Sequence, residues 1–292
     1  MECELWRQLY KRVMQAGRER ATPPYVRFGD ALIACVFFWA CLHDRPVSWA
    51  CVKRHWRTTS WKPLTLPSPS TLSRRLRTES VKQLLAAIEK NIRESFPCEA
   101  EKFLDGKPLP IGGCSKDREA RFGRGSGGKA RGYKLHVIYG FRPVPEAWTV
   151  RPMNDCEWVV ARDLIPQLTG EGYLVADGAY DKNHLYDLSL VHHHQLVAAR
   201  SHPQAKGLGH QRHSLQRIRS LAMLNEPRGK ELMKHRLAIE RYFGNATAFA
   251  GGLVSLPPWV RTLARVTRWV AAKLLINAVR ILVRKELTAS MQ

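Results

Sequence analysis

Between residues 102 and 199 the chain alternates short apolar runs with segments of helical spacing, and this alternation limits the fold more than any other feature. Strands are predicted at residues 103–106, 133–139, 147–150, 173–176 and 195–199. Helices are predicted among them at residues 157–168 and 183–192. Because strands interleaved with helices form a sheet that the helices cover, the pattern predicts an α/β fold.

Residues 1–99 lack this alternation and are predicted to form an all-helical N-terminal domain. Prolines break the segment at residues 23–24, at 46 and within 63–69. Residues 30–43 are apolar nearly all round, which predicts a buried helix. The composition changes near residue 100, so we place a second domain at residues 100–292, with a helical C-terminus.

The last third of the chain begins with a segment that has few structural signals. Residues 200–234 are basic, rich in histidine and without apolar periodicity, so we expect an extended or mobile segment there. A helix is predicted at residues 234–249. One long helix or a helix pair is predicted at residues 260–287, where apolar residues recur every three or four positions.

The charge of the chain indicates its partners. Its 292 residues include 47 Lys and Arg against 25 Asp and Glu, a formal net charge of +22. A polyanion neutralises such self-repulsion most easily, so nucleic acid is the leading predicted partner and an anionic membrane surface is second. The most apolar run, residues 31–42, is shorter than the about 20 residues that span a bilayer. The N-terminus has no secretory signal, so we expect a cytoplasmic, nucleoid-associated protein and no membrane partner.

One short basic segment of the helical domain is a candidate for DNA contact. A Ser or Thr cap opens a predicted helix at residues 70–77, and this helix carries Arg74, Arg75 and Arg77. Such a helix suits a DNA groove or backbone. The alternative is a solvated basic face that packs through Leu72 and Leu76, and the sequence leaves both interpretations open.

Two motifs suggest ligands that their surroundings do not support. Residues 123–129 match G-x-G-x-x-G and most of a phosphate-binding loop, but a strand-like segment follows where a helix is required. We therefore expect a flexible basic loop and no nucleotide cofactor. The adjacent His192, His193 and His194 have no Cys or carboxylate at ligand spacing, which argues against zinc. The seven Cys residues contain no C-x-x-C pair and are predicted to be structural thiols.

Three acidic residues are the strongest candidates for chemistry. Asp105 and Asp177 each close a predicted strand, and Glu240 lies on a predicted helix. Carboxylates placed in this way can converge on Mg²⁺ or Mn²⁺, and two such ions about 4 Å apart can cleave a phosphodiester. Each acid also has a structural explanation, because an Asp-Gly pair forms turns and Arg236 stands four residues before Glu240. Their occurrence together in a basic chain favours a site.

The chain resembles the DDE-type transposases of bacterial insertion sequences over residues 102–285. The matching segments are residues 105–110, 112–117, 132–136, 172–181 and 236–244, the last containing Arg236-x-x-x-Glu240-Arg241. The resemblance implies a ribonuclease-H-like mixed sheet flanked by helices. It also implies that Asp105, Asp177 and Glu240 are the catalytic, metal-binding triad for two Mg²⁺ or Mn²⁺ ions. Arg236 is then the arginine of the family's extended signature.

The sequence departs from the family in the glutamate region. Some relatives have Tyr three residues before the arginine and Lys seven residues after the glutamate, where this chain has Met233 and Thr247. Few strand signals lie between Asp177 and Glu240, so we expect no large β insertion, and a DNA-hairpin intermediate is not supported. The alternative acidic ligands are Asp117, Asp155 and Asp181.

The resemblance and the charge together predict a transposase that cuts element ends and joins the freed 3′-hydroxyls to target DNA. Its partners would be double-stranded DNA, at element ends and target, and a second copy of the chain in a DNA-bound homodimer. The predicted DNA-binding residues are Arg74, Arg75, Arg77, Lys107, Lys129, Arg131, Lys134, Arg236 and Arg241. The alternatives are a catalytically silent DNA-binding relative and a ribonuclease-H-like nuclease without strand transfer.

Overall fold

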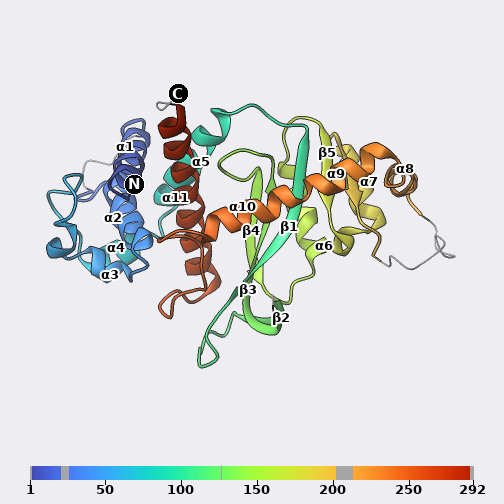
Figure 1. The fold of residues 1–292 in the computed structure, drawn as a ribbon. Helices are drawn as coiled ribbons and strands as arrows, with labels where there is room; N and C mark the ends of the chain where they lie inside the picture. The colour runs from blue at the N-terminus through green and yellow to red at the C-terminus, as the bar shows by residue number, and fades with distance from the viewer. Residues whose placement is uncertain (1, 21–25, 126, 202–212, 290–292) are drawn as a thin grey trace. The chain divides into compact units, whose positions relative to one another are not determined.

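A computed structural model describes residues 2–20, 26–125, 127–201 and 213–289 (Figure 1). The chain divides into two compact units. Unit 1 comprises Met1–Ser95, Ala246–Leu253 and Arg268–Gln292, and unit 2 comprises Phe96–Asn245 and Val254–Thr267. The C-terminal segment therefore groups with the N-terminal helices, although the sequence alone assigned it to the second domain.

Unit 1 is built of helices. They are α1 (Glu2–Arg18), α2 (Asp30–Leu42), α3 (Val47–Ala50), α4 (Pro69–Arg75), α5 (Glu79–Glu94) and the later part of α11 (Leu263–Ala289), with a short 3-10 helix at Lys53–Trp56. Helix α2 is buried from Ile33 to Leu42, which confirms the prediction for this apolar segment. Lys273 of α11 is also buried, and its ammonium group donates to the carbonyls of Cys41 and Gly251 and to the carboxylate of Asp44.

Unit 2 contains a mixed sheet, which confirms the predicted α/β class and its ribonuclease-H-like type. The strands are β1 (Glu101–Pro110), β2 (Arg121–Gly125), β3 (Gly128–Tyr139), β4 (Ala147–Pro152), β5 (Gly172–Ala176) and β6 (His194–Ala198). The order is β2-β3-β1-β5-β6, with β4 paired to β3. Strands β1, β5 and β6 are parallel, whereas β3 runs antiparallel to β1, β2 and β4.

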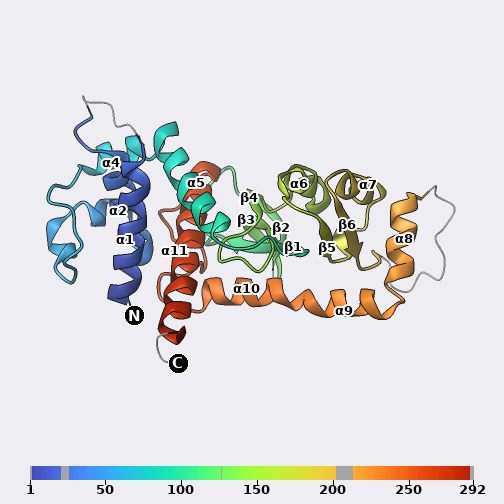
Figure 2. The same ribbon diagram turned by 90° about the horizontal axis from the view of Figure 1, so that it is seen from above.

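Helices cover both faces of this sheet, as Figure 2 shows. Helices α6 (Glu157–Leu164) and α7 (Asn183–Val191) share a buried core with Leu104 of β1 and Ile138 of β3. Helices α9 (Pro227–His235) and α10 (Leu237–Thr247) lie across the opposite face. There Tyr242 stacks on Tyr139, with ring centroids 4.5 Å apart. Each face of the sheet is therefore protected from water by helices.

Strand β1 extends beyond the predicted strand at residues 103–106 and forms no turn at Asp105-Gly106. The strand continues to Pro110 because β3 pairs with it throughout, with Asp105 opposite Val137 and Gly106 opposite His136. Residues 123–129 likewise do not form the predicted flexible loop. Their described part belongs to the antiparallel β2–β3 hairpin, and Ser126 lies outside the described residues.

The predicted extended segment at residues 200–234 is also wrong where the structure describes it. Helix α8 (Leu215–Met223) begins at Ser214, whose hydroxyl accepts the backbone N–H groups of Gln216 and Arg217. Helix α9 follows, and α10 starts at Leu237 instead of residue 234. The remainder of the predicted segment, residues 202–212, lies outside the described residues. Between Asp177 and Glu240 the described chain has one strand, β6.

No helix in the described part of the chain combines the length and the apolar character needed to cross a membrane.

Candidate active site

Asp105 lies in the middle of β1, a central strand of the sheet. Its Oδ1 accepts the backbone N–H of Gly106 at 2.7 Å. Burial raises the pKa of Asp105 to about 6; the charges of Asp177 and Glu157 raise it as well, while the Gly106 N–H and Arg236 lower it. The pKa of Asp105 therefore reflects two neighbouring carboxylates, which raise it, and one arginine, which lowers it.

Asp177 follows β5, which is the parallel neighbour of β1. Leu104 pairs with Ala176, so the next residues, Asp105 and Asp177, occupy adjacent positions on strands roughly 4.8 Å apart. The Oδ1 of Asp177 accepts the N–H of Ala179 at 2.9 Å and caps the 3-10 helix Gly178–Tyr180. Burial raises the pKa of Asp177, and the charge of Glu157 acts in the same direction. The structure thus brings two of the three predicted acids together.

Glu240 connects to these aspartates through Arg236. The guanidinium of Arg236 donates to Glu240 Oε1 at 2.9 Å, and its Nη1 lies 3.9 Å from Asp105 Oδ2. The Glu240 side chain is half exposed on the first turn of α10. The ion pair between Arg236 and Glu240 that the sequence offered as an alternative is present, and it also reaches Asp105.

Asp105 and Glu240 both pair with Arg236 in this conformation. Among the residues that the structure describes, no group of three or more His, Cys, Asp or Glu side chains is arranged to hold a metal ion. Asp105 and Asp177 nevertheless fit one chemically, because two neighbouring carboxylates whose pKa values are raised by burial gain from a divalent cation. Glu240 could join them only if it exchanged its Arg236 contact for the ion.

Glu157 is a residue of this site that the sequence analysis missed. It is the first residue of α6, and its Oε1 accepts from Lys134 Nζ of β3 at 2.6 Å. Its charge raises the pKa values of both aspartates, after burial as the larger cause. An acid in the first turn of a helix is explained by the helix dipole alone, so the sequence carried no signal that distinguished Glu157.

The predicted DNA-binding residues differ in their surroundings. Arg74, Arg77, Lys129 and Arg241 are exposed. Arg75 pairs with Asp30, Lys134 with Glu157, and Arg131 donates to the carbonyls of Ser115, Asp117 and Ala120. Lys107 is half-buried over the ring of Phe243. Only the exposed group presents its charge to solvent without rearrangement, and DNA contact by any of the nine stays a prediction.

The alternative acids have structural partners. Asp117 is buried and accepts from Tyr133 Oη at 2.8 Å and from the N–H of Thr262 at 2.9 Å. Asp181 is buried against Arg217. Asp155 lies half-exposed in the turn after β4. None of the three contributes to the charge effects on Asp105 or Asp177.

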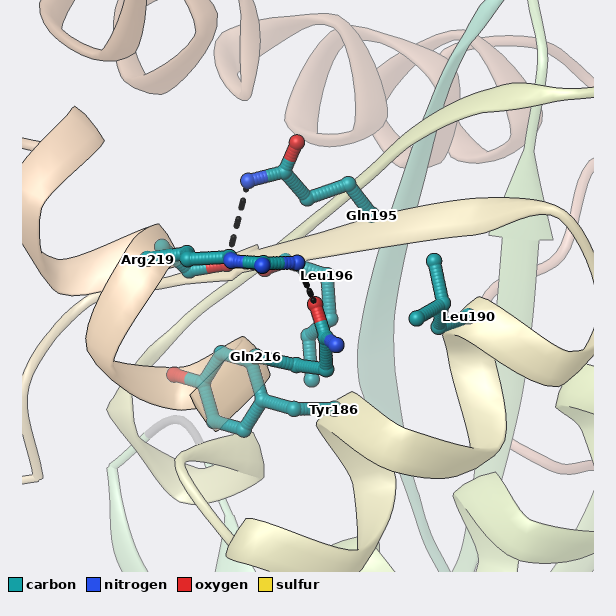
Figure 3. A pocket seen from close by; sticks show the side chains of 7 residues that line it. Tyr186, Leu190, Gln195, Leu196, Gln216 and Arg219 are labelled. Atoms are coloured by element: carbon teal, nitrogen blue, oxygen red, sulfur yellow. Dashed lines mark hydrogen bonds between the residues drawn. The ribbon is translucent and has the colours of Figure 1, made fainter. Parts of the chain in front are cut away.

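A separate cavity of about 150 Å³ lies between α7, β6 and α8 (Figure 3). Its polar side chains bond to one another, since Gln195 donates to Ser220 and Arg219 donates to Gln216. The lining offers no carboxylate, histidine or cysteine that would hold a metal ion.

Comparison with known proteins agrees with the geometry of the sheet and the acids. No curated protein matches the chain. A family model described as the transposase DDE domain matches residues 98–276. The match covers more than half of the chain and includes all six strands together with Asp105, Asp177 and Glu240. The chain therefore belongs to the family of transposases with a DDE domain.

Proposed function

We propose that this protein cuts phosphodiesters at the ends of a mobile element and transfers the resulting 3′-hydroxyl ends to target DNA with two bound metal ions. Membership of this family indicates a transposase-type function on DNA. The observation that supports the specific proposal is the placement of Asp105 and Asp177 directly after paired residues of two parallel central strands.

Asp105, Asp177 and Glu240 would hold the ions, which we propose to be Mg²⁺ or Mn²⁺. When bound, two such ions polarise the phosphodiester, activate the attacking water or hydroxyl and stabilise the leaving oxygen. Arg236 follows α9 and stands directly before α10, the helix that carries Glu240. Release of Glu240 by Arg236 would free the carboxylate for an ion and the guanidinium for a phosphate.

Double-stranded DNA, both element ends and target, would be the substrate, and pairing of two ends would require a homodimer. The helical residues 1–99 would bind the element ends, and the exposed Arg74 and Arg77 support this assignment. Lys129 and Arg241 are exposed in unit 2 and suit contacts to the phosphate backbone.

Cleavage of a duplex that carries the element's own ends, with Mg²⁺ or Mn²⁺, tests the proposal. We expect the wild-type protein to cleave and Asp177→Asn to lose activity by a factor of about 100 or more, because a metal ligand is removed. Asp163→Asn is the matched control, since Asp163 is an exposed surface acid paired with Arg151. Equal cleavage by wild type and Asp177→Asn would remove Asp177 from the mechanism.

The same reaction separates the two alternatives. DNA binding without cleavage by the wild-type protein would identify a silent relative. Cleavage without joined products after addition of a target duplex would identify a nuclease that lacks strand transfer.

A further inference from the structure

We propose that Glu157 is a fourth carboxylate of the metal site and that Lys134 neutralises it until an ion binds. The inference rests on the proposed function, because it takes Asp105 and Asp177 as ligands of a divalent cation. It adds a residue from α6, an element on the opposite face of the sheet from Glu240.

Glu157 approaches β1 at Gly106, the residue after Asp105. Asp105 Oδ1 accepts the Gly106 N–H, and Glu157 Oε1 lies 3.5 Å from the point that a Cβ atom on Gly106 would occupy. The same Cβ atom would stand 2.9 Å from Cδ of Lys134. The absence of a side chain at residue 106 therefore lets Lys134 and Glu157 pack against β1 beside Asp105.

The hydroxyl group of Tyr180 gives an independent indication of a ligand here. Tyr180 is fully buried, and no described residue forms a hydrogen bond with its hydroxyl oxygen. Burial raises its pKa, and the charges of Glu157, Asp105 and Asp177 all add to the increase. The phenol oxygen therefore lies within range of the charges of all three carboxylates. A buried hydroxyl without a partner costs about 1–3 kcal/mol, and a hydrated cation among these carboxylates would supply the partner.

The ammonium group of Lys134 supplies the positive charge beside Glu157 in the present conformation. Its Nζ lies 2.6 Å from Glu157 Oε1, and the two side chains are only 9% and 23% exposed. Lys134 also acts on Asp177, whose pKa is raised by burial and lowered by this ammonium charge. Lys134 and a divalent ion would consequently compete for the same carboxylates.

This competition separates the proposal from a purely structural ion pair. If the pair only holds α6 against β3, removing either partner breaks the same contact and shifts ion binding in the same direction. If Glu157 is a ligand, loss of Glu157 weakens ion binding, whereas loss of the Lys134 charge strengthens it.

Mn²⁺ binding by the full-length chain without DNA, measured from the electron paramagnetic resonance signal of free Mn²⁺, tests the inference. We expect Glu157→Gln to weaken binding by a factor of about 10 or more. We expect Lys134→Met to tighten it by a factor of about two or more. Asp163→Asn, which changes another acid of the same helix, should bind like wild type, because Asp163 is 59% exposed and pairs with Arg151.

Wild-type affinity in Glu157→Gln, or a loss in both Glu157→Gln and Lys134→Met, would overturn the inference. Circular dichroism checks that each variant is folded. If Glu157→Gln unfolds, Mn²⁺ binding by Lys134→Met decides: tighter binding supports the inference, and weaker or unchanged binding overturns it. Asp177→Asn distinguishes the two proposals. If it binds Mn²⁺ like wild type, the proposed metal site itself fails; if it loses binding while Glu157→Gln does not, only the role of Glu157 fails.

Discussion

Asp181 is buried in an ion pair with Arg217, whereas Asp177, only four residues away, belongs to the candidate active site. The Asp181 side chain is fully buried, and Arg217 donates to it through Nε at 2.6 Å and Nη2 at 2.8 Å. Ser201 N–H and Tyr186 Oη donate as well. Burial raises the pKa of Asp181, but the hydrogen bonds from Arg217 and Ser201 outweigh it and hold the pKa at about 2. Asp181 therefore anchors α8 to the segment that follows β5.

Asp181→Asn should lower the free energy of unfolding by about 3–5 kcal/mol at neutral pH, because it leaves the Arg217 charge without its partner. The folded pKa of about 2 lies below the ordinary value of 3.8. The contribution of Asp181 is therefore complete above about pH 4 and is lost as the pH falls toward 2. Urea unfolding at pH 7 and pH 3 should show the difference between variant and wild type shrinking in acid.

Asp163→Asn again serves as the control for this stability measurement. It removes an exposed pair with Arg151, and we expect a loss of at most about 1 kcal/mol. A loss no larger for Asp181→Asn than for Asp163→Asn would contradict the anchoring role.

At the scale of elements, the long β1–β3 pair positions the acids. The eight paired positions from Phe103–Tyr139 to Pro110–Gly132 carry Asp105 at their interior. The two strands leave no room for a side chain at Gly132, where a Cβ atom would stand 2.3 Å from the backbone oxygen of Leu109. A backbone atom cannot move aside as a flexible side chain does, so this position requires glycine.

Gly132→Ala should destabilise the protein by about 1–3 kcal/mol, because the added methyl group overpacks the strand pair. Gly112→Ala is the matched control, since no atom lies within 4 Å of a Cβ at that position. It should be neutral or should stabilise by up to about 1 kcal/mol through the unfolded chain. Thermal unfolding of both variants measures the two effects, and equal midpoints would show that the close approach at Gly132 is not tight.

For the whole molecule, the net charge of +22 is the property that governs association with DNA. Phosphate contacts release counterions, so the logarithm of the affinity falls by about 0.9 per contact with each tenfold rise in salt. In unit 1, Arg75 is engaged with Asp30, whereas Arg74 and Arg77 are exposed. The basic segment therefore offers two arginines to solvent and uses the third to hold α4 to α2.

Replacing both Arg74 and Arg77 with Ala should weaken DNA binding and reduce the salt slope by about 2. Fluorescence anisotropy with an end-containing duplex over a range of salt concentrations gives the slope. Lys90→Ala, which removes an exposed lysine of α5 that pairs with Glu94, should leave the slope unchanged. An unchanged slope in the double variant would support the solvated basic face instead.

The sequence by itself determined the elements whose signal is local. Residues 30–43 are apolar on every side, and residues 133–139 and 173–176 show strand patterns, so periodicity alone predicted a buried helix and two strands that the structure contains. The acids Asp105 and Asp177 were identified in the same way, from the ends of predicted strands and from the motifs around them.

Tertiary structure alone decided the features that depend on partners distant in the sequence. Strand β1 passes through Asp105-Gly106 because β3 pairs with it at both residues, which outweighs the turn preference of Asp-Gly. Glu157 meets Lys134 across 23 residues, and Asp181 meets Arg217 across 36. Periodicity describes which face of an element is apolar, but it contains no information on which elements meet. The partners of the buried charges were therefore decided only when the sheet and its helices packed together.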